Sequence, residues 1–436
     1  MSFYLKADAA FLLTLMSSSI SIEETVMPTP SSNTLHQDAQ VIGLVGTAHG
    51  VSHFFQLLLA SLFPWLKLAF DLSYAELGFL MTVFFIVSGI GQALAGFVVD
   101  KIGARTVLFA GMGCLGVAAL AMSLAPNYPM LLAGSMLAGL GNCVFHPSDF
   151  TLLNKRVSLA RLGHAFSVHG ISGNLGWAAA PVFMTTIATA ASWRVALFCA
   201  AFVAFAVLAL LWAYRALLAT PVVQPAASHH ADAQPGAVLD FMRLPSVWLC
   251  FGFFLITALA LGGVQSFSSP GLRALYEMSL PMATTAFTAF MLASAAGMVW
   301  GGFLASKTTH HDRTIALAFT GSGLMALIIA TGWVPAWGAL VLMAAVGLGA
   351  GIAGPSRDLL IRAAAPKHAT GRVYGVVYSG LDAGVAIAPL LFGALMDANH
   401  PAWVFICIGV FQMLAIVTAI GVGSDTSKRA AGAQAA

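Results

Sequence analysis

The chain has 436 residues, of which 59% are hydrophobic and only 8% are charged. Because soluble domains contain about 25% charged residues, this composition excludes a soluble fold and indicates a protein that lies in a lipid bilayer. The formal net charge of +3 gives no reason to expect a nucleic-acid partner.

Apolar runs of about 20 residues, enough to cross a bilayer as a helix, recur along the chain. Residues 1–40 include a Ser-, Thr- and Pro-rich stretch and predict a disordered cytoplasmic tail. We expect two six-helix bundles at 41–217 and 246–423, a flexible cytoplasmic linker at 218–245 and a cytoplasmic tail at 424–436. The sequence thus predicts an all-α membrane protein with twelve transmembrane helices, at 41–63, 75–99, 106–125, 130–153, 165–188, 193–217, 247–270, 283–305, 314–333, 336–362, 370–396 and 401–423.

Positive charge gives the orientation, because cytoplasmic loops carry an excess of lysine and arginine. With the N-terminus in the cytoplasm, most of the 19 lysines and arginines lie on the cytoplasmic side. The outer side holds Lys67, Arg194 and Arg273, and Arg357 falls inside a span. We therefore expect a monomeric, multi-pass protein of a bacterial inner membrane with both termini in the cytoplasm.

An internal repeat relates the two halves of the chain. Residues 139–148 read GLGNCVFHPS, and residues 347–356 read GLGAGIAGPS. At the same spacing, Gly176 recurs as Gly384 and Pro181 recurs as Pro389. Both copies begin in the cytoplasm and have six spans, so they are parallel repeats of the kind found in transporters.

A loop motif follows the second span and carries a family resemblance. Residues 96–105 read GFVVDKIGAR, which places Gly96, Asp100, Lys101, Gly103 and Arg105 in one short segment. With twelve spans and two parallel halves, this segment resembles the cytoplasmic loop of the major facilitator superfamily. The resemblance implies a gating role for the segment. We expect Asp100 to pair with Arg156 or Arg161 of the next cytoplasmic loop only when the cytoplasmic side is closed.

Three further segments resemble the fosmidomycin resistance protein branch of that superfamily. They read HGVSHFFQLLLASLFPWL at 49–66, GLGNCVFHPSD at 139–149 and RLGHAFSVHGISGNLGWAAAP at 161–181. This resemblance implies proton-driven efflux of a small, often anionic compound. It does not fix the cargo.

Polar side chains at membrane depth are candidates for the path of substrate and protons. Such groups are expensive in lipid and should face a wet cavity or a partner. Several share a helical face at spacings of three or four residues. The candidates are His49, His53, Gln56, Asn142, His146, Asp149, His169, Asn174, Arg357, Tyr378 and Asp382.

Chemistry suggests a role for some of these candidates. Histidine binds and releases protons near neutral pH. Burial in an apolar site can raise the pKa of a carboxylate into the same pH range. We expect Asp382, with one or more of His49, His53 and His146, to form a proton relay, and Arg357 to offer charge to an anionic substrate. Arg357 could instead extend towards the cytoplasmic end, with Asp358 on a different face of its helix, and Asp149 could pair with nearby basic residues.

No motif indicates an enzyme or a bound cofactor. The five cysteines lie in apolar runs without a disulfide or CxxC pattern. No nucleotide-binding loop, nucleophile elbow or HExxH motif occurs. Without an ATP-binding module, transport would draw on an ion gradient, for which we expect protons, or on the substrate's own gradient.

Three alternatives to proton-coupled efflux stay open. The first is a proton-coupled importer of an organic anion. The second is a divalent metal transporter, in which His49, His53, His146 and Asp149 would surround the ion. The third is a receptor or assembly factor that transports nothing.

Overall fold

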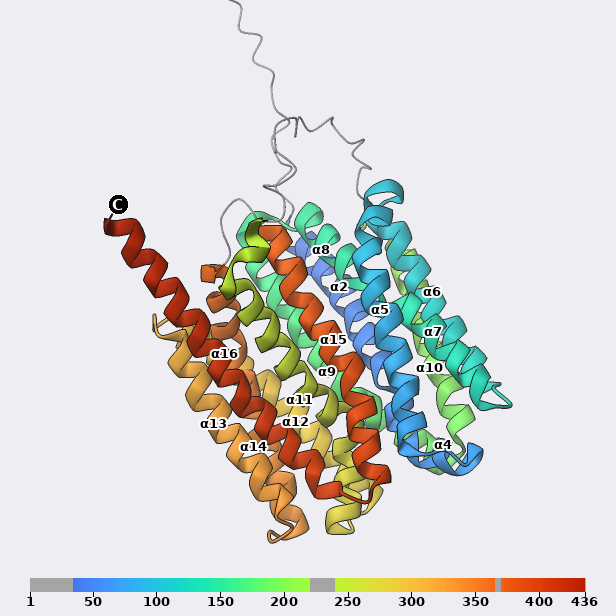
Figure 1. Cartoon of the computed structure of the whole chain (residues 1–436). Helices are drawn as coiled ribbons and strands as arrows, with labels where there is room; N and C mark the ends of the chain where they lie inside the picture. The colour runs from blue at the N-terminus through green and yellow to red at the C-terminus, as the bar shows by residue number, and fades with distance from the viewer. Residues whose placement is uncertain (1–33, 220–239, 365–369, 436) are drawn as a thin grey trace, which may run out of the picture.

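The computed structural model describes residues 34–219, 240–364 and 370–435 (Figure 1). The described part is built from helices and contains no strand. The α-helices are α2 (Leu35–Gln56), α3 (Leu58–Ser61), α4 (Phe63–Phe70), α5 (Tyr74–Ile102), α6 (Ala104–Ser123), α7 (Tyr128–Asn142), α8 (Phe145–Arg156), α9 (Leu162–Ala190), α10 (Trp193–Ala213), α11 (Pro245–Tyr276), α12 (Leu280–Ala305), α13 (His311–Ala330), α14 (Ala336–Ala364), α15 (Thr370–Asp397) and α16 (Pro401–Ala435).

Each predicted span corresponds to one helix or to a short series of helices, which confirms the predicted all-helical membrane fold. The first span is divided into α2, α3 and α4, and the fourth into α7 and α8. Within the described residues, ten segments are long and apolar enough to cross a membrane. The first and fifth spans, which carry His49, His53 and His169, are not among them.

Proline explains two of the breaks. Pro64 has no N–H to donate to the carbonyl of Ala60, so the helix is interrupted between α3 and α4. Pro147 likewise has no N–H to donate to the carbonyl of Cys143, and α7 ends at Asn142, the residue before Cys143. In a bilayer, carbonyls freed in this way need partners inside the protein.

Helix boundaries at the ends differ from the predicted tails. Residues 35–40 belong to α2 rather than to a disordered tail, because Thr34 and Gln37 form a capping box that starts the helix. Residues 1–33 of that tail and 220–239 of the linker lie outside the described residues. At the other end of the chain, α16 continues as a helix to Ala435 through most of the expected C-terminal tail.

The two halves meet along two helix pairs, α5 with α15 and α9 with α12. Figure 1 shows α5 and α15 side by side. Gly78 of α5 permits this approach, since an added Cβ there would overlap the carbonyl oxygen of Pro389. Close packing of small residues is a common way to hold helices together in lipid.

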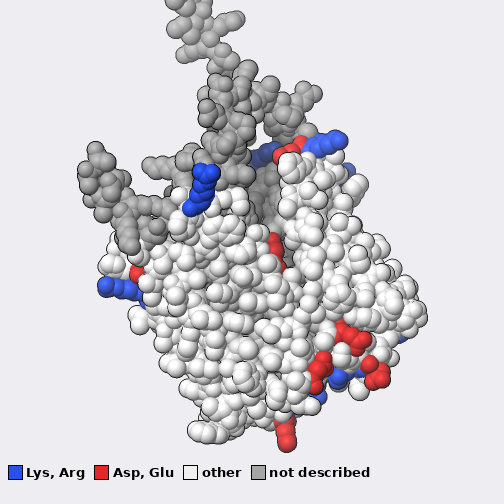
Figure 2. Space-filling model, in the orientation of Figure 1, with Lys and Arg blue, Asp and Glu red and all other residues white. Residues whose placement is uncertain are grey.

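The halves are joined more tightly at one end than at the other. We call the end at which α10 stops and α11 starts the linker end, and the opposite one the far end. At the far end, Thr82 Oγ1 donates to the carbonyl of Ala386 at 2.7 Å, and the rings of Phe63 and Phe267 have centroids 5.5 Å apart. Figure 2 shows a hollow between the halves at the linker end, with acidic side-chain atoms visible inside it.

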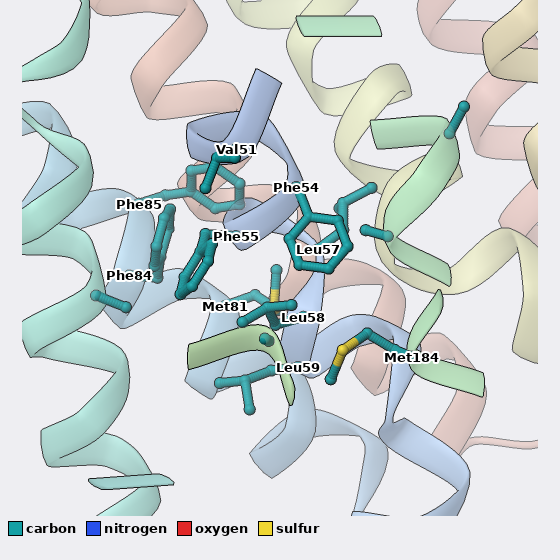
Figure 3. Packing of buried hydrophobic residues seen from close by; sticks show 14 of the residues in the cluster. Val51, Phe54, Phe55, Leu57, Leu58, Leu59, Met81, Phe84, Phe85 and Met184 are labelled. Atoms are coloured by element: carbon teal, nitrogen blue, oxygen red, sulfur yellow. The ribbon is translucent and has the colours of Figure 1, made fainter. Parts of the chain in front are cut away.

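Aromatic packing holds the broken first span in place. Figure 3 shows Phe55 of α2 beside Phe84 and Phe85 of α5, with Phe54 on its other side and Leu58 of α3 below. Phe55 is 3% exposed and Leu58 is 1% exposed. This contact fixes α2 in the N-terminal half, so the polar residues earlier in α2 have defined neighbours.

Candidate functional site

Four histidines and one carboxylate meet inside the N-terminal half. His49 and His53 come from α2, His146 and Asp149 from α8, and His169 from α9. The side chains of His49 and Asp149 are 2% and 0% exposed. We call these five residues the histidine cluster.

Asp149 connects two of the rings. Its Oδ2 lies 3.2 Å from Nε2 of His169 in a hydrogen bond, and 3.2 Å from Nδ1 of His49 at ion-pair distance. The rings of His49 and His169 stack with centroids 3.5 Å apart, and those of His49 and His53 lie 4.3 Å apart. His146 is 5.1 Å from His49 by ring centroid.

The cluster keeps unused polar atoms. Nδ1 of His146 and Oδ1 of Asp149 are buried and have no hydrogen-bond partner among the described residues. A buried polar group without a partner costs about 1–3 kcal/mol, and such groups need an explanation. A proton that moves between the rings, or an ion held among them, would use these atoms.

The geometry also fits a metal ion. One ring nitrogen each from His49, His146 and His169 lie within 4.8 Å of one another, and Asp149 contacts two of these rings. Imidazole nitrogen and carboxylate oxygen are the ordinary ligands of Zn²⁺ and related ions. The arrangement therefore suits either protons or a divalent cation.

Three predicted site residues of the N-terminal half lie outside the cluster. Asn142 bridges helices, since its Oδ1 accepts from Ser52 at 2.6 Å and its Nδ2 donates to Ser88 at 2.8 Å. Gln56 accepts from the indole of Trp177 at 2.9 Å. Asn174 donates to the carbonyl of Gly170 within its own helix and lies against Met298 of α12.

The C-terminal half carries the predicted arginine. Arg357 of α14 forms an ion pair with Asp358 through a 2.9 Å hydrogen bond, and its guanidinium lies 5.0 Å from the ring centroid of Phe254. Tyr378 of α15 packs against the same Phe254, at 4.9 Å between centroids. Asp358 is the next residue in the helix and starts from a different face, and the long arginine side chain bends around the helix to reach it.

Asp382 lies where the two halves meet. It is one helical turn beyond Tyr378 in α15, and a Cβ added to Gly89 of α5 would be 3.2 Å from its Cβ. The side chain is half-buried, and the described residues offer it no hydrogen bond or ion pair. Asp382 thus contacts both halves without a fixed polar partner.

The predicted gate residues form contacts within the N-terminal half. Arg161 donates through Nε to Asp38 at 2.6 Å, Arg156 to the carbonyl of Leu217 at 2.8 Å, and Arg105 to the carbonyl of Arg215 at 3.0 Å. Asp100 is exposed and makes no ion pair with a described residue. The expected pairing of Asp100 with either arginine is absent from the described contacts, and the hollow lies at this end of the molecule.

The rest of the loop motif shapes the turn between α5 and α6. Gly103 has a φ of 90°, a backbone conformation that residues with a side chain rarely adopt. Lys101 is exposed beside it, and Gly96 faces open space.

Two acids with clear partners were missed by the sequence reasoning. Asp38 had been assigned to the tail, and the capping pattern of Thr34 and Gln37 was the signal that could have placed it in a helix. Asp397 binds the start of α5, on the other half, through the backbone amides of Tyr74 and Ala75. No sequence pattern indicates that second contact, because it joins residues distant in the chain.

Comparison with known proteins agrees with this architecture. The family profile described as Major Facilitator Superfamily matches residues 45–307 and 256–435. The fosmidomycin resistance protein of Escherichia coli is 26% identical over 273 residues, covering 61% of this chain and 65% of that protein, so the match spans slightly less than two thirds of the relative. The uncharacterized transporter YfnC of Bacillus subtilis is 24% identical over 387 residues, 86% of this chain and 91% of its own length.

A solved structure shows the same fold. A bacterial homolog of the human lysosomal transporter Spinster, in an inward-facing and occupied conformation, superposes with a TM-score of 0.65 at 13% identity, over 89% of this chain and 96% of that one. The helices, the paired halves and the family match together identify this chain as a membrane transporter of the Major Facilitator Superfamily, and not an enzyme.

Proposed function

We propose that the protein exports a small organic anion in exchange for protons, by alternating access between its two halves. The observation that carries this proposal is the histidine cluster, in which one buried carboxylate lies against two of four neighbouring imidazole rings. Ionisable groups at membrane depth mark ion or proton routes. The linker end would face the cytoplasm, as the distribution of positive charge predicts.

Asp382 supports the coupling step. It lies between the halves and lacks a fixed partner, so its surroundings depend on how the halves are arranged. A carboxylate whose solvation differs between two states has a different proton affinity in each. Proton binding at Asp382 would then favour one state over the other.

Arg357 supports an anionic cargo. Its guanidinium stays charged at all relevant pH values and binds carboxylate and phosphonate groups in a bidentate manner. The ion pair with Asp358 offsets part of this charge. We propose that the substrate anion replaces or shares that partner when it binds.

The far-end contacts support the proposed state of the molecule. Hydrogen bonds and close packing join α5 to α15 there, while the hollow lies at the linker end. In the proposed orientation this is the inward-facing state. Efflux, rather than import, is favoured by the similarity to a resistance protein.

The test uses purified full chain in proteoliposomes with fosmidomycin, a phosphonate, as the probe. In wild-type vesicles, an outward substrate gradient is expected to move protons the opposite way, read by an entrapped pH dye. Asp382→Asn should abolish proton movement but retain exchange of labelled fosmidomycin against unlabelled compound. Asp71→Asn, at an exposed acid of the far end, is the matched control.

Two outcomes would contradict the proposal. Uphill transport by Asp382→Asn at the wild-type rate would remove Asp382 from coupling. Proton-coupled uptake into vesicles whose extracellular side faces the medium, with none into cytoplasmic-side-out vesicles, would show import, the direction opposite to the one proposed.

A divalent metal cargo is the second candidate, favoured by the nitrogen positions of His49, His146 and His169. It predicts that Zn²⁺ or Co²⁺ enters vesicles at a rate that His146→Gln lowers strongly. A Co²⁺ absorption spectrum typical of tetrahedral nitrogen and oxygen ligands would support it. Absence of metal flux together with phosphonate exchange would exclude it.

A further inference from the structure

A second cavity lies at the far end, between the two halves and away from the histidine cluster. It has a volume of about 280 Å³ and is lined by residues of α3, α4, α9, α11 and α12. That volume is close to the lower limit for small-molecule sites, about 300 Å³. Its wall combines apolar side chains with Lys67, Arg273, Gln265 and Ser266.

The two basic residues come from opposite halves. Lys67 of α4 donates to the carbonyl of Leu72 at 2.8 Å and lies 4.3 Å from the ring centroid of Tyr74. One such bond leaves an ammonium group with further N–H donors. Arg273 of α11 is exposed and has no hydrogen bond or ion pair with any described residue.

Two polar side chains of α11 lack partners at the same wall. The amide nitrogen of Gln265 and the hydroxyl of Ser266 are buried and form no hydrogen bond in the described part of the chain. These residues are 7% and 3% exposed, and both line the cavity. Buried polar groups are normally satisfied by protein, water or ligand, so these two await a ligand or water.

The two nearby acids are hydrogen-bonded to residues at the start of α5. Asp397 accepts hydrogen bonds from the backbone amides of Tyr74 and Ala75, and Glu76 accepts from the backbone and hydroxyl of Ser73. Both carboxylates thus face the start of α5, where amide groups favour negative charge. Glu76 also interacts with the charge of Lys67, so Arg273 is the cation of this cavity without an ion pair to a described residue.

We propose that this far-end cavity binds one small organic anion, with its charged group between Lys67 and Arg273 and its body against Gln265 and Ser266. This inference deepens the proposed function and rests on it, since the cavity would hold the exported anion on the side opposite to Arg357. The ligand class is a monoanion or dianion of a few carbon atoms, such as an alkyl phosphonate or carboxylate.

The test measures binding without transport. Arg357→Gln is introduced first, so that binding in the hollow of the linker end does not contribute. Propylphosphonate is titrated into this purified full chain at constant ionic strength, with 1-propanol as the uncharged comparison. Saturable thermal stabilisation by propylphosphonate alone is the expected result, because a ligand that binds the folded state raises its stability.

Removing one cation then locates the site. Arg273→Gln should weaken propylphosphonate binding about tenfold or more, the effect expected for losing a charged hydrogen bond, and Arg273→Lys should retain most of it. Arg194→Gln removes the same charge at the same end but at a side chain that bonds the carbonyl of Ser123, and should change nothing. Arg273 is exposed and has no hydrogen bond or ion pair with a described residue, so this variant should fold normally.

The outcomes separate the two proposals. If binding is absent in the Arg357→Gln chain, or is the same in Arg273→Gln as in its parent, the far-end site is wrong even where proton-coupled transport is observed. If binding depends on Arg273 while no phosphonate or proton flux occurs in vesicles, the site stands and the proposed transport function fails.

Discussion

The carboxylate of Asp397, at the end of α15, accepts a 2.7 Å hydrogen bond from the backbone amide of Tyr74, at the start of α5. Its second oxygen accepts from the amide of Ala75 at 2.8 Å. A side chain of the C-terminal half thus caps a helix of the N-terminal half, a placement that also suits the positive end of α5. This contact links the halves at the far end.

Asp397→Asn should loosen the far end. Asparagine has only one acceptor oxygen, so one of the two hydrogen bonds from the amides of Tyr74 and Ala75 is lost. The NH₂ group of the asparagine then faces a backbone N–H. In a chain whose five cysteines are replaced, spin labels at Leu68 and Trp333, which are 86% and 90% exposed, report the separation. We expect a new population at longer distance, whereas Asp71→Asn should leave the distances unchanged. An unaltered distribution in Asp397→Asn would show that the cap does not hold the halves together.

Gly78→Ala should disturb the same interface by steric overlap. The added methyl group would meet the carbonyl of Pro389, and overpacking typically costs about 1–3 kcal/mol. We expect a lower midpoint of thermal unfolding in detergent. Gly96→Ala in the same helix is the matched control, because nothing lies within 4 Å of its added Cβ. If the two variants had equal midpoints of thermal unfolding, the close packing of α5 against α15 would not contribute to stability.

Asp38 should make stability depend on acid pH. Burial raises its pKa, but hydrogen bonds from Ser158 and Arg161 outweigh that effect and hold the pKa below the usual value. Since the pKa is depressed on folding, the stabilisation is complete above the unfolded pKa, about 3.9, and is lost as pH falls through the folded pKa.

Asp38→Asn removes that contribution. We expect it to lower stability at pH 7 by about 1–3 kcal/mol and to flatten the acid limb of a plot of unfolding midpoint against pH. Asp100→Asn, at an exposed acid without an ion pair among the described residues, is the control. If the unfolding midpoint of Asp38→Asn falls at acid pH as it does in the wild type, the pH dependence belongs to other carboxylates.

Asn142 should affect stability more than transport chemistry. Its two hydrogen bonds join Ser52 of α2 to Ser88 of α5, and such bonds in membrane proteins contribute about 0.6–1.7 kcal/mol each. Asn142→Leu is expected to lower the unfolding midpoint and to keep proton-coupled exchange at temperatures where it stays folded. If the variant lost exchange while its unfolding midpoint stayed unchanged, Asn142 would belong to the transport path.

The sequence predicted the helices well because membrane spans depend on local composition. Length and apolarity placed every crossing, and the capping pattern around Thr34 explains why α2 starts six residues before its predicted span. The histidine cluster was accessible in part, since spacings of three and four residues put His49 with His53, and His146 with Asp149, on common faces. The stacking of His49 on His169 could not be predicted from the sequence, because it depends on how α2 and α9 pack.

Contacts between distant helices account for the remaining differences. Spacing along α14 placed Arg357 and Asp358 on different faces, and it did not show that the long arginine side chain bends round the helix to reach Asp358. Arg161 pairs with Asp38, which joins a loop to the start of the first helix; its pairing with Asp100 was expected only when the cytoplasmic side is closed. Neither outcome follows from periodicity, which describes one helix at a time.

The histidine cluster lies entirely within one half, in α2, α8 and α9, while Asp382 lies across the boundary from Gly89. When the halves rotate as rigid bodies, distances inside the cluster stay constant and only the surroundings of Asp382 change. Under the proposed proton coupling, the cluster would store protons with similar affinity in both states, and Asp382 would be the group that senses which state the protein occupies. Storage and sensing would then be separate tasks, carried out by residues that never need to move relative to their own half.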